Sequence, residues 1–203
     1  MRIVRLASTP STQDVARDLP VGTAVVADFQ TAGRGRLRRV WEAPPGTALL
    51  ASFVMPARPL ASLVAGVAAA HACGPSARLK WPNDVILHGA KLAGILAERL
   101  ADRVVLGIGV NLTAAPPGAA MLGDGVGRDA LLDRLVDDLQ RWFAAPDREV
   151  LAAWRERAET LGKVVRVELP GETFEGVAED VTDEGSLVVS GRTVSAGDVI
   201  HLR

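Results

Sequence analysis

Two short apolar segments on either side of an arginine-rich loop constrain the fold most strongly. Residues 23–29 are rich in valine and alanine, and residues 47–55 are largely apolar; runs of this length between turn residues indicate buried strands. Between them, residues 31–41 contain four arginines and no acidic residue. Like charges clustered this closely repel one another, so a basic loop held between two buried strands points to an anionic ligand.

The composition is that of a globular protein. The chain has 203 residues, 48% of them hydrophobic, which is enough for one main domain with a small appendage. A formal net charge of −1 argues against a nucleic-acid footprint over the whole surface, so anion binding must come from local charge. Cys73 is the single cysteine, which excludes a disulfide framework and a cysteine-rich metal site. No segment has the long apolar core of a signal peptide or membrane span, so we expect a soluble, cytoplasmic protein.

The rest of the chain alternates strands and helices before ending in a β-rich segment. Ser11 can cap a short helix, with Asp14 reaching back to it, and Pro20 stops that helix. We expect further helices at 60–73, 129–144 and 148–161, the last closing at Gly162, and strands at 78–81, 85–87, 91–100 and 104–112. From Lys163 onward, short strands and turns predict a small all-β module that packs on the main domain.

The loop at 31–41 has the chemistry of a phosphate site. Guanidinium groups match phosphate oxygens in planar forks, and glycines let backbone N–H groups approach an anion. The loop is neither a Walker loop nor a dinucleotide fingerprint, because it lacks their further residues. A solvated basic loop and an RNA-binding arginine–glycine segment are the alternatives; RNA-binding segments of this kind usually repeat in disordered tails.

Two further motifs carry candidate functional residues. In Lys80-Trp81-Pro82-Asn83-Asp84 and the following Lys91, a lysine can meet a carboxylate or phosphate, and Asp84 can hold Mg²⁺ or accept a proton. Taken singly, these residues also suit an ordinary turn. In 107–112, glycines within a strand leave room for a flat ligand, and Asn111 can pair with an adenine edge. A glycine-kinked core strand is the plain alternative.

Taken in order, these motifs closely resemble those of the biotin–protein ligases. The resemblance covers about residues 11–112 and rests on Ser-Thr-Gln-Asp, Gln-x-Ala-Gly-Arg-Gly-Arg-x-x-Arg-x-Trp, Lys-Trp-Pro-Asn-Asp, Lys-x-x-Gly-Ile-Leu and Gly-x-Gly-x-Asn. The final module is similar to the SH3-like C-terminal domain of that family. The resemblance implies an α+β fold, with a mixed-sheet catalytic domain at 1–161 and a small SH3-like β-barrel at 162–203. No amino-terminal DNA-binding winged helix is expected.

The resemblance also implies a reaction and its participants. Biotin and Mg-ATP form biotinyl-5′-AMP and pyrophosphate, and a specific lysine of a biotin carboxyl carrier protein then takes the biotin. ATP, Mg²⁺ and biotin are the expected small molecules, and neither DNA nor a membrane is an expected partner. An exposed strand edge could pair with a second copy, giving a homodimer, or with the carrier domain.

Carried over residue by residue, the resemblance assigns three sets of functional residues. Catalysis falls to Lys91, Arg36 and Asp84, with Asp84 also the candidate Mg²⁺ ligand. Biotin binding falls to Ser11, Thr12, Gln13, Gln30, Arg34, Gly35, Arg36, Lys91 and Gly94. ATP and phosphate binding falls to Gly33, Arg34, Arg36, Arg39, Trp41, Lys80 and Asn111.

Two positions depart from the family pattern. Arg38 stands where the loop usually has glycine, which we expect to make the loop stiffer and more basic. Gln13 replaces the more usual asparagine. A lipoate or octanoate ligase of the same superfamily is the nearest alternative, but it lacks this loop and the Lys-Trp-Pro-Asn-Asp element. A non-catalytic nucleic-acid-binding module is the alternative from a different class.

Overall fold

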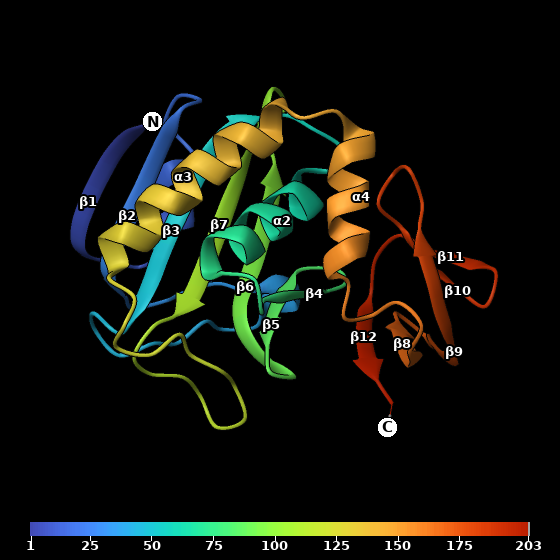
Figure 1. The fold of residues 1–203 in the computed structure, drawn as a ribbon. Helices are drawn as coiled ribbons and strands as arrows, with labels where there is room; N and C mark the ends of the chain where they lie inside the picture. The colour runs from blue at the N-terminus through green and yellow to red at the C-terminus, as the bar shows by residue number, and fades with distance from the viewer. Residues whose placement is uncertain (203) are drawn as a thin grey trace.

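The computed structural model describes residues 1–202, which form two β-sheets and a layer of helices (Figure 1). The larger sheet has the strand order β1-β2-β3-β7-β6-β5-β4. Its strands are β1 (Arg2–Thr9), β2 (Thr23–Gln30), β3 (Ala48–Pro56), β4 (Arg78–Lys80), β5 (Asp84–Leu87), β6 (Ala90–Arg99) and β7 (Arg103–Asn111). β1 runs parallel to β2 and the other pairs are antiparallel. The mixed sheet predicted from the sequence is therefore confirmed.

Helices cover one face of this sheet. They are α2 (Ala61–Cys73), α3 (Arg128–Ala144) and α4 (Asp147–Arg157), and Figure 1 shows α2 against the sheet with α3 and α4 packed around it. Helix α2 is made mostly of alanine and valine and is buried on nearly every side, as expected for a helix that is apolar all round. No helix within residues 1–202 is long and apolar enough to cross a membrane.

Alternation along the strands separates the core from the opposite face of the sheet. In β3, Leu49 and Phe53 belong to the core beneath α2, whereas Val54 packs on the other face against Ala16 of the short helix α1 (Thr12–Ala16). Because successive residues point to opposite faces, Ser52 shares the face of Val54. The same rule places alternate residues of β7 on this second face, over which α1 and the arginine loop lie.

The C-terminal module is an antiparallel sheet with the order β11-β10-β9-β8-β12. Its strands are β8 (Val164–Leu169), β9 (Glu172–Val181), β10 (Leu187–Val189), β11 (Arg192–Val194) and β12 (Asp198–His201). The indole N–H of Trp81 donates to the carbonyl of Gly185 over 3.0 Å, and the buried residues of both sheets form one continuous core. The module is thus packed firmly on the main sheet.

Most predicted elements are confirmed, including residues 91–100 as a strand and Ser11 as the cap of α1, and three details differ. Strand β1 was not predicted. Asp14 faces Arg34 at 2.7 Å instead of turning back to Ser11. The last helix ends at Arg157, well before Gly162, because Ala158 bridges in parallel to Leu79 of β4.

Candidate active site

A cavity of about 270 Å³ opens on the face of the large sheet opposite α2. Residues of α1, the arginine loop, six strands of the large sheet, β8 and β12 line it. Of the residues assigned from the sequence, it brings together Ser11, Thr12, Gln13, Gln30, Arg34, Gly35, Arg36, Arg39, Trp41, Lys80, Asp84, Lys91 and Gly94. Gly33 lies beneath this set, with Gln30 and Trp41 beside it, and Asn111 lies outside the cavity.

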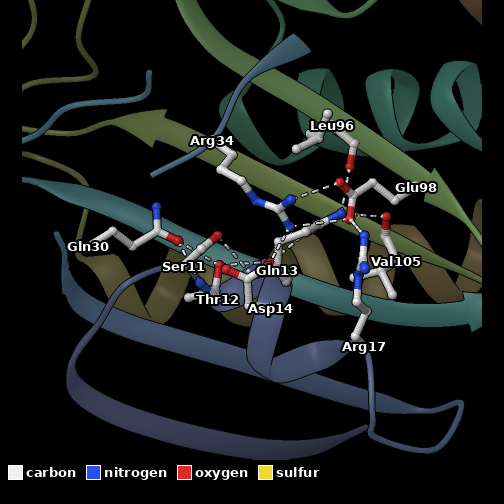
Figure 2. A network of polar contacts seen from close by, with 11 residues as sticks. Ser11, Thr12, Gln13, Asp14, Arg17, Gln30, Arg34, Leu96, Glu98 and Val105 are labelled. Carbon is white, nitrogen blue, oxygen red and sulfur yellow. Dashed lines mark hydrogen bonds and ion pairs between the residues drawn. The ribbon is translucent and has the colours of Figure 1, made fainter. Parts of the chain in front are cut away.

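A buried network of neutral polar groups forms one end of the cavity (Figure 2). The amide oxygen of Gln30 accepts from the backbone N–H of Thr12 at 2.7 Å and from its hydroxyl at 2.9 Å. The Thr12 and Ser52 hydroxyls lie 2.8 Å apart, and Ser52 donates to Gln13 over 3.0 Å. Gln13 in turn donates to the carbonyl of Val105 over 3.0 Å. These bonds fix the orientation of each group before any ligand arrives.

Arg34 fastens the arginine loop to the two elements beside it. Its guanidinium lies 2.7 Å from Asp14 of α1 and 3.3 Å from Glu98 of β6 (Figure 2). Two carboxylates therefore already offset the charge that the sequence assigned to phosphates.

Arg36 and Arg39 point instead toward the C-terminal module and the turn before β5. Arg36 donates to the side chain of Asn83 at 3.2 Å and to the carbonyl of Gly197 at 3.4 Å. Arg39 forms an ion pair with Asp198. Burial lowers the pKa of Arg36 and the nearby carboxylate of Asp198 raises it, and an arginine remains charged at any working pH.

The backbone of the loop is closed on itself. Trp41 donates to the carbonyl of Gly33 at 3.0 Å, and Gly35 donates to that of Arg39 at 2.7 Å. A Cβ atom on Gly33 would lie only 2.3 Å from the carbonyl oxygen of Trp41, so this position admits glycine alone. At the tip, Leu37 and Arg38 have φ of 52° and 61°, the left-handed region in which side chains are strained.

The indole of Trp41 covers the glycines of β6 and β7. A Cβ atom would lie 2.5 Å from the ring at Gly109 and 3.0 Å at Gly94, and at Gly107 it would lie 2.7 Å from the side-chain oxygen of Gln13. The sequence predicted close approach to β7, and this is confirmed. The flat group over Gly109 is, however, the chain's own tryptophan instead of a ligand.

Lys91 lies where two cavities meet. Its ammonium lies 2.7 Å from Asp84 and 5.8 Å from the ring centroid of Trp41. Besides the main cavity, Lys91 and Trp41 line a second one of about 190 Å³. Asn111 borders this second cavity, with its side-chain N–H donating to the carbonyl of Ala120 at 2.9 Å.

Two acids of the C-terminal module reach the main cavity, and sequence reasoning missed both. They are Glu168 of β8 and Asp198 of β12. No local pattern marks them, because only the docking of the module brings them near the loop. Lys80 lies in the same region, and burial lowers its pKa while Asp84 raises it.

No preformed protein cage for a metal ion is seen within residues 1–202, although Mg²⁺ beside phosphates needs only one or two carboxylates. Within residues 1–202 no group of three or more histidine, cysteine or acidic side chains could hold a metal ion. Asp84, the candidate ligand, is ion-paired with Lys91. We therefore derive no step through a protein-held metal.

Comparison with known proteins agrees with this geometry. Residues 5–113 match the model of the biotin/lipoate A/B protein ligase family, and residues 160–202 match that of the biotin protein ligase C-terminal domain. The biotin–acetyl-CoA-carboxylase ligase of Mycobacterium tuberculosis is 41% identical over 90% of this chain and 80% of its own length. The ligase of the same name from Paracoccus denitrificans is 36% identical over 92% of this chain and 93% of its own length.

The fold comparison points the same way. Biotin protein ligase from Aquifex aeolicus, solved in complex with biotin and ATP, superposes with a TM-score of 0.83 at 26% identity, covering 100% of this chain and 99% of that one. The chain belongs to the biotin/lipoate A/B protein ligase family.

Proposed function

We propose that this chain is an ATP-dependent biotin–protein ligase that works in two steps. In the first, a carboxylate oxygen of biotin attacks the α-phosphorus of ATP and the bond to the β-phosphate breaks, giving biotinyl-5′-AMP and pyrophosphate. In the second, the neutral ε-amine of a lysine on a biotin carboxyl carrier domain attacks the acyl carbon, AMP leaves, and the amine loses a proton. The names of the two bacterial relatives support both the activity and the class of acceptor.

The position of Lys91 between the two cavities is the observation that carries this proposal. The first step must bring a carboxylate and a triphosphate together, although the two anions repel each other. Lys91 borders both cavities and is held there by Asp84 and Trp41. A cation fixed at this junction offsets the repulsion and stabilises the charge of the transition state. We assign Asp84 to holding Lys91 in place.

The main cavity suits the biotin head group at its polar end. The head group is an uncharged bicyclic urea with both donors and acceptors, and it needs fixed neutral partners. Ser11, Thr12 and Gln30 offer hydroxyl and amide groups there, and none of them is ionisable. Apolar side chains such as Leu50 and Leu96 line the same cavity and suit the alkyl chain that leads toward Lys91.

The second cavity suits the adenine ring of the nucleotide. Trp41 forms the wall that it shares with the main cavity, and Asn111 lies at its border with its amide plane fixed by Ala120. A nucleotide held there extends its α-phosphate toward Lys91. We assign the β- and γ-phosphates to Arg36 and Arg39, which stabilise the negative charge that develops as pyrophosphate leaves. Arg34, already paired with two acids, fastens the loop.

A test of the first step is biotin-dependent exchange of labelled pyrophosphate into ATP. We expect Lys91→Ala to lower this exchange by about 100-fold or more, the scale of losing a fixed charge-stabilising donor. Lys163→Ala is the matched control, because Lys163 lies outside both cavities and pairs with Glu159. Full exchange in Lys91→Ala would refute the role of Lys91.

The acyl substrate and the acceptor are tested separately. Wild-type protein should support pyrophosphate exchange with biotin and not with lipoate, and should then label a carrier-domain lysine with biotin. Exchange with lipoate instead of biotin would point to the lipoate branch of the family.

A further inference from the structure

The C-terminal module places a carboxylate directly on the arginine loop. Asp198 begins β12, lines the main cavity, and forms an ion pair with Arg39. The side chain of Asp198 is only 19% exposed, whereas that of Arg39 is 67% exposed. The aspartate is thus the more buried partner of the pair and the arginine the more exposed one.

The same short segment also contacts the second arginine of the phosphate site. Arg36 donates to the carbonyl of Gly197, immediately before Asp198. Both arginines that the proposed function assigns to the departing phosphates are therefore in contact with residues 197–198. The loop rests on the module, more than 150 positions away in the sequence.

Arg39 also offsets one of two like charges that face each other in the module. Asp198 and Glu168 are directly paired across β12 and β8, and both line the cavity. Like charges directly opposite each other on a sheet repel, so a guanidinium beside them stabilises the pairing of β12 with β8. Removing Arg39 from Asp198 restores that repulsion.

We propose that Asp198 is a built-in anion of the phosphate subsite, which pairs with Arg39 until the phosphates of ATP displace it. The inference rests on the proposed function, because it takes Arg39 as a phosphate ligand. A triphosphate carries more charge and more acceptor oxygens than one carboxylate, so it binds the guanidinium of Arg39 more strongly. The affinity for ATP is lowered by the competition, and Asp198 thereby sets the nucleotide concentration at which the enzyme works.

The charge balance of the cavity supports this competition. The cavity is lined by five cations, Arg34, Arg36, Arg39, Lys80 and Lys91, and by three acids, Asp84, Glu168 and Asp198. Asp84 pairs with Lys91, so the acids of the module are the ones that offset the phosphate-binding arginines. Neutralising Asp198 frees Arg39 and removes a negative charge that repels the incoming phosphates.

The test is Asp198→Asn, which keeps the size of the side chain and removes its charge. We expect the KM for ATP in biotin-dependent exchange to fall about three- to tenfold, with an unchanged KM for biotin. Asp180→Asn is the matched control, since Asp180 lies on β9 of the same module, pairs with Arg155 of α4, and lines none of the cavities described above. An unchanged or raised KM for ATP in an active Asp198→Asn enzyme would overturn the inference.

A binding measurement separates this inference from the proposed function. Inorganic pyrophosphate, titrated calorimetrically into each protein, should bind more tightly to Asp198→Asn than to the wild type or to Asp180→Asn. A wild type without biotin-dependent exchange would count against the ligase function, whereas equal pyrophosphate affinity in all three proteins would count against the role of Asp198. If Asp198→Asn does not fold, Glu168→Gln removes the facing charge, and the same tightening is expected on a smaller scale.

The contact between Asp198 and the arginine loop can be tested separately by proteolysis. Without ligand, trypsin should cut after the loop arginines faster in Asp198→Asn than in the wild type, because the loop has lost its partner on the module. With biotin and ATP both proteins should be protected equally. Equal cutting without ligand would show that Asp198 does not hold the loop.

Discussion

Replacing Gly109 by alanine tests whether Trp41 is the group that requires glycine in β7. A Cβ atom at this position would lie 2.5 Å from Cε2 of Trp41 and must retreat to at least 3.4 Å for ordinary contact, a shift of 0.9 Å. Strand β7 is hydrogen-bonded to β3 on one side and to β6 on the other, so its backbone can move only slightly. The indole, which belongs to a loop, must move.

The free-energy cost of the substitution depends on which group moves. Overpacking a rigid site typically costs about 1–3 kcal/mol, and we expect about 1 kcal/mol here because a loop side chain yields more easily than a core. Displacing Trp41 also disturbs the wall between the two cavities and its contact with Lys91. The KM for ATP should therefore rise in the same variant.

A double-mutant cycle isolates the clash. The free energy of unfolding in urea would be measured for wild type, Gly109→Ala, Trp41→Ala and the double variant. In the Trp41→Ala background the alanine should cost less than about 0.5 kcal/mol, giving a coupling energy of more than about 0.5 kcal/mol between contacting residues. Gly125→Ala is the control, because nothing lies within 4 Å of its added Cβ. An equal cost of Gly109→Ala in both backgrounds would refute the reasoning.

Three further substitutions have defined outcomes. Arg36→Ala should leave the fold intact but release biotinyl-AMP early, measured as adenylate in the filtrate. Gly66→Ala, within α2, should stabilise the protein by about 0.5–1 kcal/mol in urea unfolding, since its Cβ would meet Leu79 at an ordinary 3.4 Å; destabilisation would contradict this. Burial, and after it the charge of Lys80, lowers the pKa of His201 from 6.5 to about 4. The neutral ring therefore stabilises the folded state fully above pH 6.5, and this contribution to the free energy of unfolding is lost as the pH falls toward 4. Between pH 7 and 4.5 the free energy of unfolding of the wild type should fall by about 1 kcal/mol more than that of His201→Gln, a value reduced for solvent screening. Equal falls in the two proteins would refute this prediction.

Local chemistry predicted much of the fold and the main features of the site. Apolar runs marked β2 and β3, and small residues with helical spacing marked α2, because burial alone sets those patterns. Ser11 marked the start of α1 because a hydroxyl cap acts within two residues of itself. Most of the residues assigned by motif meet in the main cavity, and their order along the chain was enough to group them.

Features set by distant partners were not predicted. The alternating residues of β1 have the pattern of a half-exposed strand at a sheet edge, and only its parallel pairing with β2 defines it as one. Helix α4 has helix-forming residues beyond Arg157, but the backbone N–H of Glu159 donates to the carbonyl of Leu79 over 2.7 Å and holds the chain in extended form. Asp198 reaches the loop only because the module docks there.

Arg38 shows how such distant contacts govern the loop itself. We expected an arginine in place of glycine to stiffen the loop, yet the structure holds Arg38 at φ 61° and Leu37 at φ 52°. Each costs roughly 1–2 kcal/mol relative to glycine-like freedom, and the contacts of Arg36 and Arg39 with residues 197–198 offset that cost. Once phosphates draw those arginines away from the module, the strain at the tip favours leaving this conformation. We therefore predict that Arg38 promotes rearrangement of the loop when a nucleotide binds, to an extent that depends on Asp198.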